Sequence, residues 1–504
     1  MITKINNSIN KVSLCLGLIS GRVPLFVLLF VSISLIYLGA VPNRNEEVFM
    51  QYAKQFVNPD WIYKSSILTE FPGVRLVYQS IIGSFLRFAS FESAVFIFRF
   101  ILIIGFSFVL SKLYRSLNMG RIQAIFHLLV FFIANQSLFA GSWMMISVEP
   151  KGFAYLFILC AFYFLLNNRF VLTLTFLIIG TYFHFLAGAY STFYIFLTFL
   201  IFSKELGTGR RLIITFASIY FISVLPNLLY IVTAVRGAPE GLQPSADWIY
   251  TYFRSPHHTA LFKSLNYFIE VHVIGVILSG LGMFFAIRLK QYFVESKTLI
   301  IINFVICSLA GTLAAVLLAY FDTEGVFLKY YPFRINTVST FFLMLIIVKW
   351  AWDSIKSKTI STVKGILLIC ILLMILRETI PNIKNNLHHI LSKDTIGEAC
   401  EFIKVTSNEK AKIFSFLDDS TIMRKAERDR FVSYKLTPAE LSEIHEWYFR
   451  VLEKRRAIAD PQYLGHLLEK YHITYILCRK TYELSGPYHL EYSNDDFSVY
   501  SVVK

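Results

Sequence analysis

Charged residues are scarce in this chain of 504 residues: they make up 16% of it, whereas hydrophobic residues make up 56%. A soluble protein usually carries about a quarter charged residues. The chain also holds 49 Phe and 28 Tyr, more than soluble cores could bury, so lipid must be part of its solvent. The composition argues against an ordinary soluble enzyme and predicts an α-helical polytopic membrane protein.

Several common motifs are absent as well. The sequence has no Walker loop, no Gly-rich dinucleotide fingerprint, no His-Glu-x-x-His and no zinc cysteine spacing, so a nucleotide-driven pump is not expected. The formal charge of +15 comes without a dense Lys/Arg run, which argues against nucleic acid as a partner. Of the six cysteines, only Cys400 and Cys478 lie in the polar tail, and the sequence leaves open whether they pair.

Long apolar segments predict about eleven transmembrane helices, because roughly 17–25 apolar residues are needed to cross a bilayer. The candidate spans are 24–42, 92–112, 122–140, 152–167, 170–186, 189–203, 212–233, 266–287, 298–320, 335–350 and 360–377. The stretch 74–90 is amphipathic and holds Arg75 and Arg87. We expect it to lie on the membrane surface, because a spanning helix would have to bury both charges.

Basic residues predict the orientation. If the N-terminus is cytoplasmic, the short inner loops carry more Lys and Arg than the longer outer loops. An odd number of spans then places the C-terminus outside. The basic N-terminal segment has no convincing cleavage site, so we expect a retained first helix and not a signal peptide.

The composition changes to that of a soluble domain from about residue 385. Short apolar runs read as buried strands at 411–417, 430–436, 473–479 and 497–503. Amphipathic patterns predict helices at 438–458 and 461–471. We therefore expect a transmembrane domain over 1–384, with outer loops at 43–91 and 234–265, and an extracytoplasmic α/β domain over 385–504.

Residues with catalytic or binding chemistry gather in the predicted outer loops. Carboxylates can act as general bases or hold divalent cations, and cationic side chains bind phosphate. The acids are Glu46, Glu47 and Glu149, and the cations are Arg254, His257, His258, Lys329 and Arg334. Solvation, helix-dipole or headgroup contacts would explain each one alone. Their recurrence in successive loops of one face favours a phosphorylated lipid carrier and an acid that activates an acceptor.

The first loop resembles a motif of the GT-C superfamily of membrane glycosyltransferases, which includes oligosaccharyltransferase, protein O-mannosyltransferases and aminoarabinose transferases. The stretch "NEEVFMQYAKQF" at 45–56 is similar to the acidic motif of that superfamily. The stretch 71–102 resembles its surface helix and second span, with Arg99 opening the span. "EPKGFAYLFIL", "YFHFLAG" and "FRSPHH" look like segments of uncharacterised bacterial members. The usual first aspartate is Glu46 here, so either Glu46 or Glu47 could match the catalytic position.

The resemblance implies an enzyme of the bacterial cytoplasmic membrane that moves a sugar from a polyprenyl-phosphate or -diphosphate donor to a glycan, lipid or protein acceptor, with inversion. Glu46 or Glu47 would be the base, the five cations would bind the donor phosphate, and Glu149 would position the acceptor. No cofactor is certain; in a metal-dependent variant, Glu46 and Glu149 would hold Mg²⁺ or Mn²⁺.

The sequence is compatible with three alternatives. The nearest is a polyprenyl-linked polysaccharide polymerase or ligase, which also works at the outer face. A lipid or sugar transporter is more distant, because such proteins usually show repeats and charges at mid-membrane. The third is a scaffold without catalytic activity.

Overall fold

The computed structural model describes residues 23–68, 75–145, 147–207, 209–235, 241–354, 360–438, 441–482, 484 and 486–502. These residues form two compact units. The first, called the helical unit, holds the described residues of 1–39, 96–227 and 255–385. The second, called the mixed unit, holds those of 40–95, 228–254 and 386–504. The basic residues before the first predicted span lie in 1–22, outside the described residues.

A helix coincides with each predicted span. These helices are α2 (Leu25–Tyr37), α5 (Phe91–Ser116), α6 (Arg121–Ile133), α7 (Pro150–Leu166), α8 (Phe170–Phe183), α9 (Phe185–Ile201), α10 (Arg210–Val235), α13 (Val273–Leu289), α14 (Ser296–Phe321), α15 (Asn336–Ser354) and α16 (Ile360–Leu391). Among the described residues, five stretches are long and apolar enough to cross a membrane: Phe91–Ser116, Arg210–Thr233, Leu265–Leu289, Ser296–Phe321 and Leu328–Ser354. The total of eleven spans and the orientation stay predictions.

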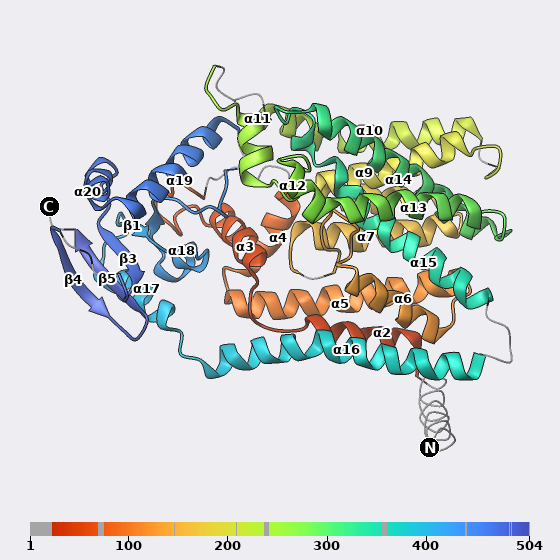
Figure 1. Cartoon of the computed structure of the whole chain (residues 1–504), viewed down its shortest axis with the longest axis horizontal. Helices are drawn as coiled ribbons and strands as arrows, with labels where there is room; N and C mark the ends of the chain where they lie inside the picture. The colour runs from red at the N-terminus through yellow and green to blue at the C-terminus, as the bar shows by residue number, and fades with distance from the viewer. Residues whose placement is uncertain are drawn as a thin grey trace. The chain divides into compact units, whose positions relative to one another are not determined.

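Aromatic side chains join the central helices of the helical unit. The ring of Phe162 on α7 lies 4.8 Å from that of Phe304 on α14 and 4.4 Å from that of Phe342 on α15. Such pairs add to the stabilisation that burial of the rings already gives. At another side of this unit α2 and α16 run side by side (Figure 1), where the Asn382 amide donates to the carbonyl oxygens of Leu35 and Leu38 at 3.2 Å.

A five-stranded sheet lies in the mixed unit. Its strands are β1 (Lys412–Ser415), β2 (Asp429–Arg430), β3 (Tyr475–Arg479), β4 (Tyr488–Ser493) and β5 (Phe497–Val502), in the order β2-β1-β3-β5-β4. β1 is parallel to β2 and β3, whereas β5 is antiparallel to β3 and β4. The predicted strands at 411–417, 473–479 and 497–503 are confirmed. The strand predicted at 430–436 is wrong beyond Arg430, and β4 was not predicted.

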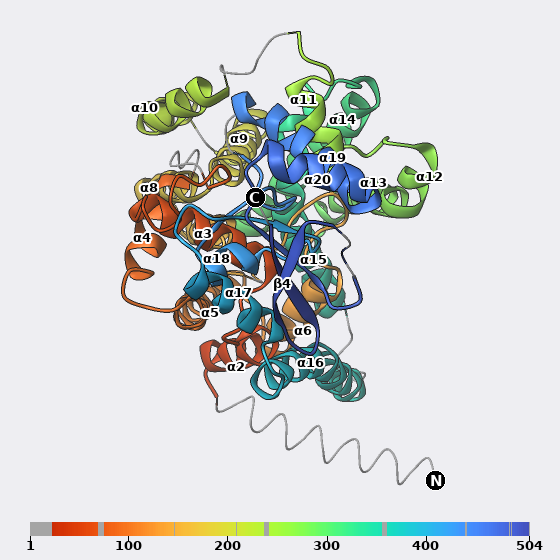
Figure 2. The same ribbon diagram turned by 90° about the vertical axis from the view of Figure 1, so that its left-hand side faces the viewer.

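Helices cover both faces of this sheet (Figure 2). Successive side chains of a strand point to opposite faces, so Ile413 and Leu477 pack with α17 (Thr395–Thr406) and α18 (Thr421–Ala426). Phe414 and Ile476 pack instead with α19 (Ile444–Ala459) and α20 (Pro461–Lys470). The helices predicted at 438–458 and 461–471 correspond to α19 and α20. Cys400 and Cys478, on α17 and β3, are buried free thiols.

The first predicted outer loop folds with the tail inside the mixed unit. It contributes α3 (Arg44–Val57) and α4 (Leu76–Phe85), the latter within the predicted amphipathic stretch. Val48 and Tyr52 of α3 share a buried apolar cluster with Met423 and Leu436 of the tail. The Tyr52 hydroxyl donates to the carbonyl oxygen of Thr437 at 2.8 Å. Residues of α3 are therefore held by partners that lie hundreds of positions away in the sequence.

Candidate functional site

Glu46 belongs to the start of α3. The Asn43 side chain accepts hydrogen bonds from the backbone N–H groups of Asn45 and Glu46 at 2.9 and 3.0 Å. In return the Asn43 backbone N–H donates to Glu46 Oε2 at 2.8 Å. This reciprocal pair is a capping box, which satisfies N–H groups that would otherwise lack partners at a helix start. The Glu46 carboxylate, fully buried, therefore has a local structural task.

Glu47 is the centre of an ion network. Arg424 of α18 donates from Nε to Glu47 Oε1 at 2.7 Å and from Nη1 to Glu92 Oε1 at 3.0 Å. Gln51, one turn along α3, also donates to Glu47 Oε1 at 3.0 Å. The other oxygen, Glu47 Oε2, is buried and has no hydrogen-bond partner within the described part of the chain. We call Glu47, Arg424 and Glu92 the acid–arginine network.

Two opposing effects decide the proton affinity of Glu47. Burial raises the pKa of its carboxyl group; the Arg424 guanidinium opposes this rise, and the charges of Glu92 and Asp419 add to it. The net pKa is above the ordinary value. Burial lowers the pKa of Arg424, but the two carboxylates outweigh this effect and keep the guanidinium charged. A buried acid with a raised pKa beside a fixed cation is a common feature of catalytic bases.

Glu149 lies in the helical unit at the start of α7. It occupies the N-cap position, but its side chain makes no capping hydrogen bond. Its Oε2 lies 2.9 Å from the Lys151 ammonium, and Ser147 donates to its Oε1. The ammonium is also 5.3 Å from the centre of the Trp143 ring. The sequence identified Glu149, whereas its tie to Lys151 and Ser147 appears only in the structure.

Three of the predicted phosphate-binding residues gather around Tyr331. The Arg334 guanidinium lies 5.0 Å from the centre of the Tyr331 ring, and the His258 ring centre lies 6.2 Å from it. The His257 and His258 rings are 4.1 Å apart. Tyr331 has a left-handed backbone, with φ +52°, a conformation that is uncommon for a large side chain and often marks functional sites.

These residues lie close enough to Lys151 to affect one another's charge. Burial lowers the pKa of His258 well below its ordinary value, and the charges of Arg334, His257 and Lys151 lower it further. His258 is therefore neutral at pH 7. We call Lys151, His257, His258 and Arg334 the cation cluster; its positive charge comes from Arg334 and from Lys151, whose charge Glu149 offsets.

Two predicted cations have other surroundings. Arg254 belongs to the mixed unit, where it donates to the Thr437 hydroxyl and to the carbonyl oxygen of Lys435. It therefore helps to hold the tail segment that follows β2. Lys329 lies with its ammonium 5.3 Å from the centre of the Tyr330 ring.

The carboxylates proposed for a metal do not fit a divalent cation. Glu46 is engaged with Asn43, and Glu149 is paired with an ammonium group, which repels a cation. Within the described ranges, no group of three or more His, Cys, Asp or Glu side chains is placed to hold a metal ion. The hard oxygen donors that Mg²⁺ or Mn²⁺ would need are therefore not assembled at these positions.

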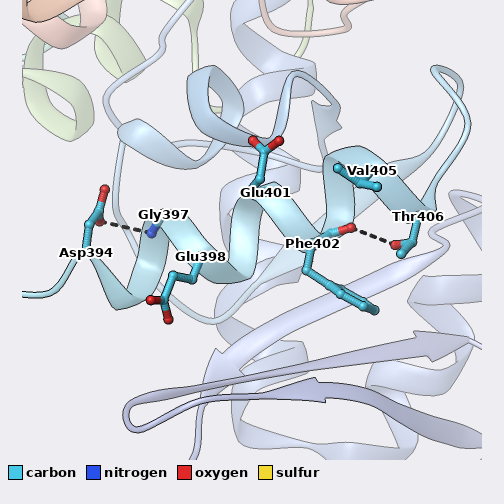
Figure 3. Close-up of a pocket in the computed structure, with 7 residues that line it drawn as sticks. All are labelled: Asp394, Gly397, Glu398, Glu401, Phe402, Val405 and Thr406. Atoms are coloured by element: carbon cyan, nitrogen blue, oxygen red, sulfur yellow. Dashed lines mark hydrogen bonds between the residues drawn. The ribbon is translucent and has the colours of Figure 1, made fainter.

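A separate groove on α17 contains none of the predicted residues (Figure 3). It is lined by Asp394, Gly397, Glu398, Glu401, Phe402, Val405 and Thr406. Asp394 caps the helix by accepting from Gly397 N–H at 3.0 Å and pairs with Lys425 at 2.6 Å, while Glu398 lies 3.4 Å from Lys393. The groove is an open helix surface, and its Asp394 and Glu398 carboxylates have structural partners.

No protein-family model and no curated protein matches the chain. Two solved structures of ArnT from Cupriavidus metallidurans resemble it at 11% sequence identity. The form bound to undecaprenyl phosphate matches over 95% of this chain and 96% of ArnT, with a TM-score of 0.47. The apo form matches over 98% of this chain and 97% of ArnT, with a TM-score of 0.49.

Proposed function

We propose that the protein is a membrane glycosyltransferase that moves a sugar from a polyprenyl-phosphate-linked donor to an acceptor hydroxyl, with inversion. The observation that supports this function best is the cation cluster. Lys151 lies in the first turn of the apolar helix α7, and Arg334 lies just before the apolar helix α15. Cations at the ends of apolar helices suit a phosphate group whose lipid chain stays in the bilayer.

The cation cluster would stabilise the leaving group. When the bond between the anomeric carbon and the phosphate oxygen breaks, negative charge grows on that oxygen. Arg334 supplies positive charge and a planar pair of donors for it, while Lys151, offset by Glu149, supplies less. His258, neutral because of its burial, would donate or accept a hydrogen bond without adding charge.

Glu47 would act as the general base for the acceptor. It would take the proton of the acceptor hydroxyl, whose oxygen attacks the anomeric carbon from the side opposite the phosphate and so inverts it. Two features favour Glu47 for this role: its raised pKa, and its Oε2, which has no hydrogen-bond partner within the described part of the chain. Glu47 is only 1% exposed, so the acceptor reaches it only after residues that cover it move aside.

Transfer by purified protein tests this proposal. Purified wild-type protein in detergent is incubated with each of a panel of radiolabelled polyprenyl-phosphate sugars, and membrane extract serves as the acceptor. We expect Glu47→Gln to lose about 100-fold or more of the transfer rate. Glu46→Gln is the matched control and should stay active, because glutamine at this position preserves the capping box.

Thermal unfolding of both variants checks that each is folded. Full turnover by a folded Glu47→Gln protein would show that Glu47 is not the base. Wild type that is folded and transfers no label from any donor would contradict the glycosyltransferase itself and favour the polymerase or transporter alternatives.

A further inference from the structure

We propose that Arg424, far along the chain in α18, is a positioning residue that fixes the orientation and the charge of the Glu47 carboxylate. The inference rests on the proposed function for the role of Glu47 as base. No local sequence pattern indicates this residue, because Arg424 lies in the tail, 377 positions after Glu47.

The guanidinium of Arg424 bridges two carboxylates through different nitrogen atoms. Nε contacts Glu47 and Nη1 contacts Glu92, at 2.7 and 3.0 Å. Its carbon centre also lies 4.8 Å from the centre of the Phe91 ring. The Glu47 side chain is 2% exposed and that of Arg424 is 15% exposed, so water screens this pair weakly and removal of either partner leaves the other poorly compensated.

Two hydrogen bonds to the Glu47 carboxylate are accepted by the same oxygen atom, Oε1. Arg424 and Gln51 both donate to Oε1, and Gln51 is held in turn by the carbonyl oxygen of Ser420 at 2.7 Å. These donors fix the plane of the carboxylate and leave Oε2 as the oxygen without a partner in the described chain. Oε2 is therefore the atom that can accept the proton of an acceptor hydroxyl.

The segment before α18 is held from the core of the tail. Arg430 donates from Nη1 to the carbonyl oxygen of Asp419 at 2.7 Å. Lys454 donates to the carbonyl oxygen of Leu417 at 2.8 Å, and Arg430 Nη2 donates to the same oxygen. Both cations are buried. Arg424 thus stands on a helix whose start is fixed by two buried side chains, as a positioning role requires.

Three charged groups face Glu47 and affect its pKa. They are Arg424 on α18, Glu92 in the first turn of α5 and Asp419 just before α18. The charge of Arg424 favours the ionised form of Glu47, whereas Glu92 and Asp419 disfavour it. Loss of Arg424 and loss of Glu92 should therefore move the titration of Glu47 in opposite directions.

Infrared difference spectroscopy can follow that titration even in a protein that has no transferase activity. The carboxyl band of Glu47 is identified as the band that Glu47→Gln abolishes. We expect Arg424→Gln to move its midpoint up by about one pH unit or more, Glu92→Gln to move it down, and Arg424→Lys to stay near wild type. The acid limb of the transfer rate against pH should shift in the same directions. Lys425→Gln, whose partner is Asp394, removes an equal charge on the same helix and should change neither.

The outcomes separate this inference from the proposed function. Midpoints that stay fixed in folded Arg424→Gln and Glu92→Gln proteins would overturn the role of Arg424, whatever the activity. Should Arg424→Gln fail to fold, Arg424→Lys decides the question: a midpoint far from that of wild type in this charge-conserving variant would overturn the role of the Arg424 charge. Shifted midpoints in a protein without transferase activity would preserve the coupling of Arg424 to Glu47 and exclude the glycosyltransferase.

Discussion

Adjacent carboxylates on α3 have different tasks because successive helical residues point about 100° apart. Glu46 turns toward the helix start and Glu47 toward Arg424. The sequence identified the pair without distinguishing its members. One signal was readable: Asn43 stands three positions before Glu46, which is the spacing of a capping box. The partner of Glu47 had no such local signal, since the contact joins two distant segments.

The predicted cations illustrate the same limit. His257, His258 and Arg334 gather with Lys151, as a phosphate site would require, whereas Arg254 serves the segment after β2. All of these residues could be proposed as phosphate ligands from their residue type and from the prediction that their loops lie on one side of the membrane. Only the packing of the loops decides which ones converge, and that packing depends on contacts such as the turn at Tyr331, which sequence patterns do not reveal.

Lys454 should make the stability of the protein depend on pH. Burial, together with the charge of Arg430, lowers its pKa to about 7, whereas an unfolded lysine titrates near 10.4. Between about pH 7 and 10 the unfolded chain therefore binds one more proton than the folded chain. This lysine alone should raise the free energy of unfolding with pH, by up to about 1.4 kcal/mol per unit.

Thermal unfolding at pH 7, 8 and 9 checks this prediction. Lys454→Met should flatten the rise of the unfolding temperature, while Lys480→Met, at an exposed position, should leave it unchanged. An identical slope in the Lys454→Met protein would contradict the shift.

The helices of the tail could be predicted only in part. The amphipathic patterns of α19 and α20 were identified, whereas α17, with 12 residues, and α18, with six, were not predicted. The stretch 430–436 alternates as a strand should, but β1 pairs with β2 only at Lys412 and Ile413. The Phe431 backbone N–H still donates to the carbonyl oxygen of Ile413 at 2.9 Å, but Phe431 and Val432 lie outside β2 and belong to a buried apolar cluster. Burial and alternation therefore predicted a strand longer than the short ladder that β1 and β2 form.

The contact of α4 with α3 depends on Gly83. A Cβ atom there would lie 2.1 Å from the carbonyl oxygen of Ala53 and 2.5 Å from a methyl group of Val57. Alanine normally favours a helix over glycine, but here the clash should dominate. We expect Gly83→Ala to destabilise the protein by about 1–3 kcal/mol, measured as a lower unfolding temperature. Ser84→Ala, at the next and exposed position, is the control; a gain in stability from Gly83→Ala would contradict the close approach.

At the scale of the molecule, the compact units are not consecutive in the sequence. The mixed unit combines 40–95, 228–254 and 386–504. A change of composition near residue 385 indicates the last of these segments, because only that segment is long and polar. The first segment could not be assigned in this way, since its contacts with the tail, such as Tyr52 with Thr437, leave no trace in local composition. The domain boundary predicted at 384/385 therefore marks the start of the tail but leaves out the earlier segments that fold with it.

The orientation of the chain is the remaining prediction, and two exposed positions test it. With the N-terminus inside, the loop between α13 and α14 faces the cytoplasm and the tail faces outward. The Val294 side chain in that loop is 92% exposed, and the Asp495 side chain in the turn before β5 is 79% exposed. In spheroplasts, a membrane-impermeant maleimide should label Asp495→Cys at once and Val294→Cys only after permeabilisation.

The unaltered chain is the background control, because Cys400 and Cys478 in its tail are buried. The reverse labelling pattern would place the tail in the cytoplasm. The tail carries Arg424 and folds with Glu47, so the proposed base would then face the cytoplasm as well. An acceptor at the outer face would be excluded, whereas the coupling of Arg424 to Glu47 would stand, since it depends on contacts within the mixed unit and not on the side of the membrane.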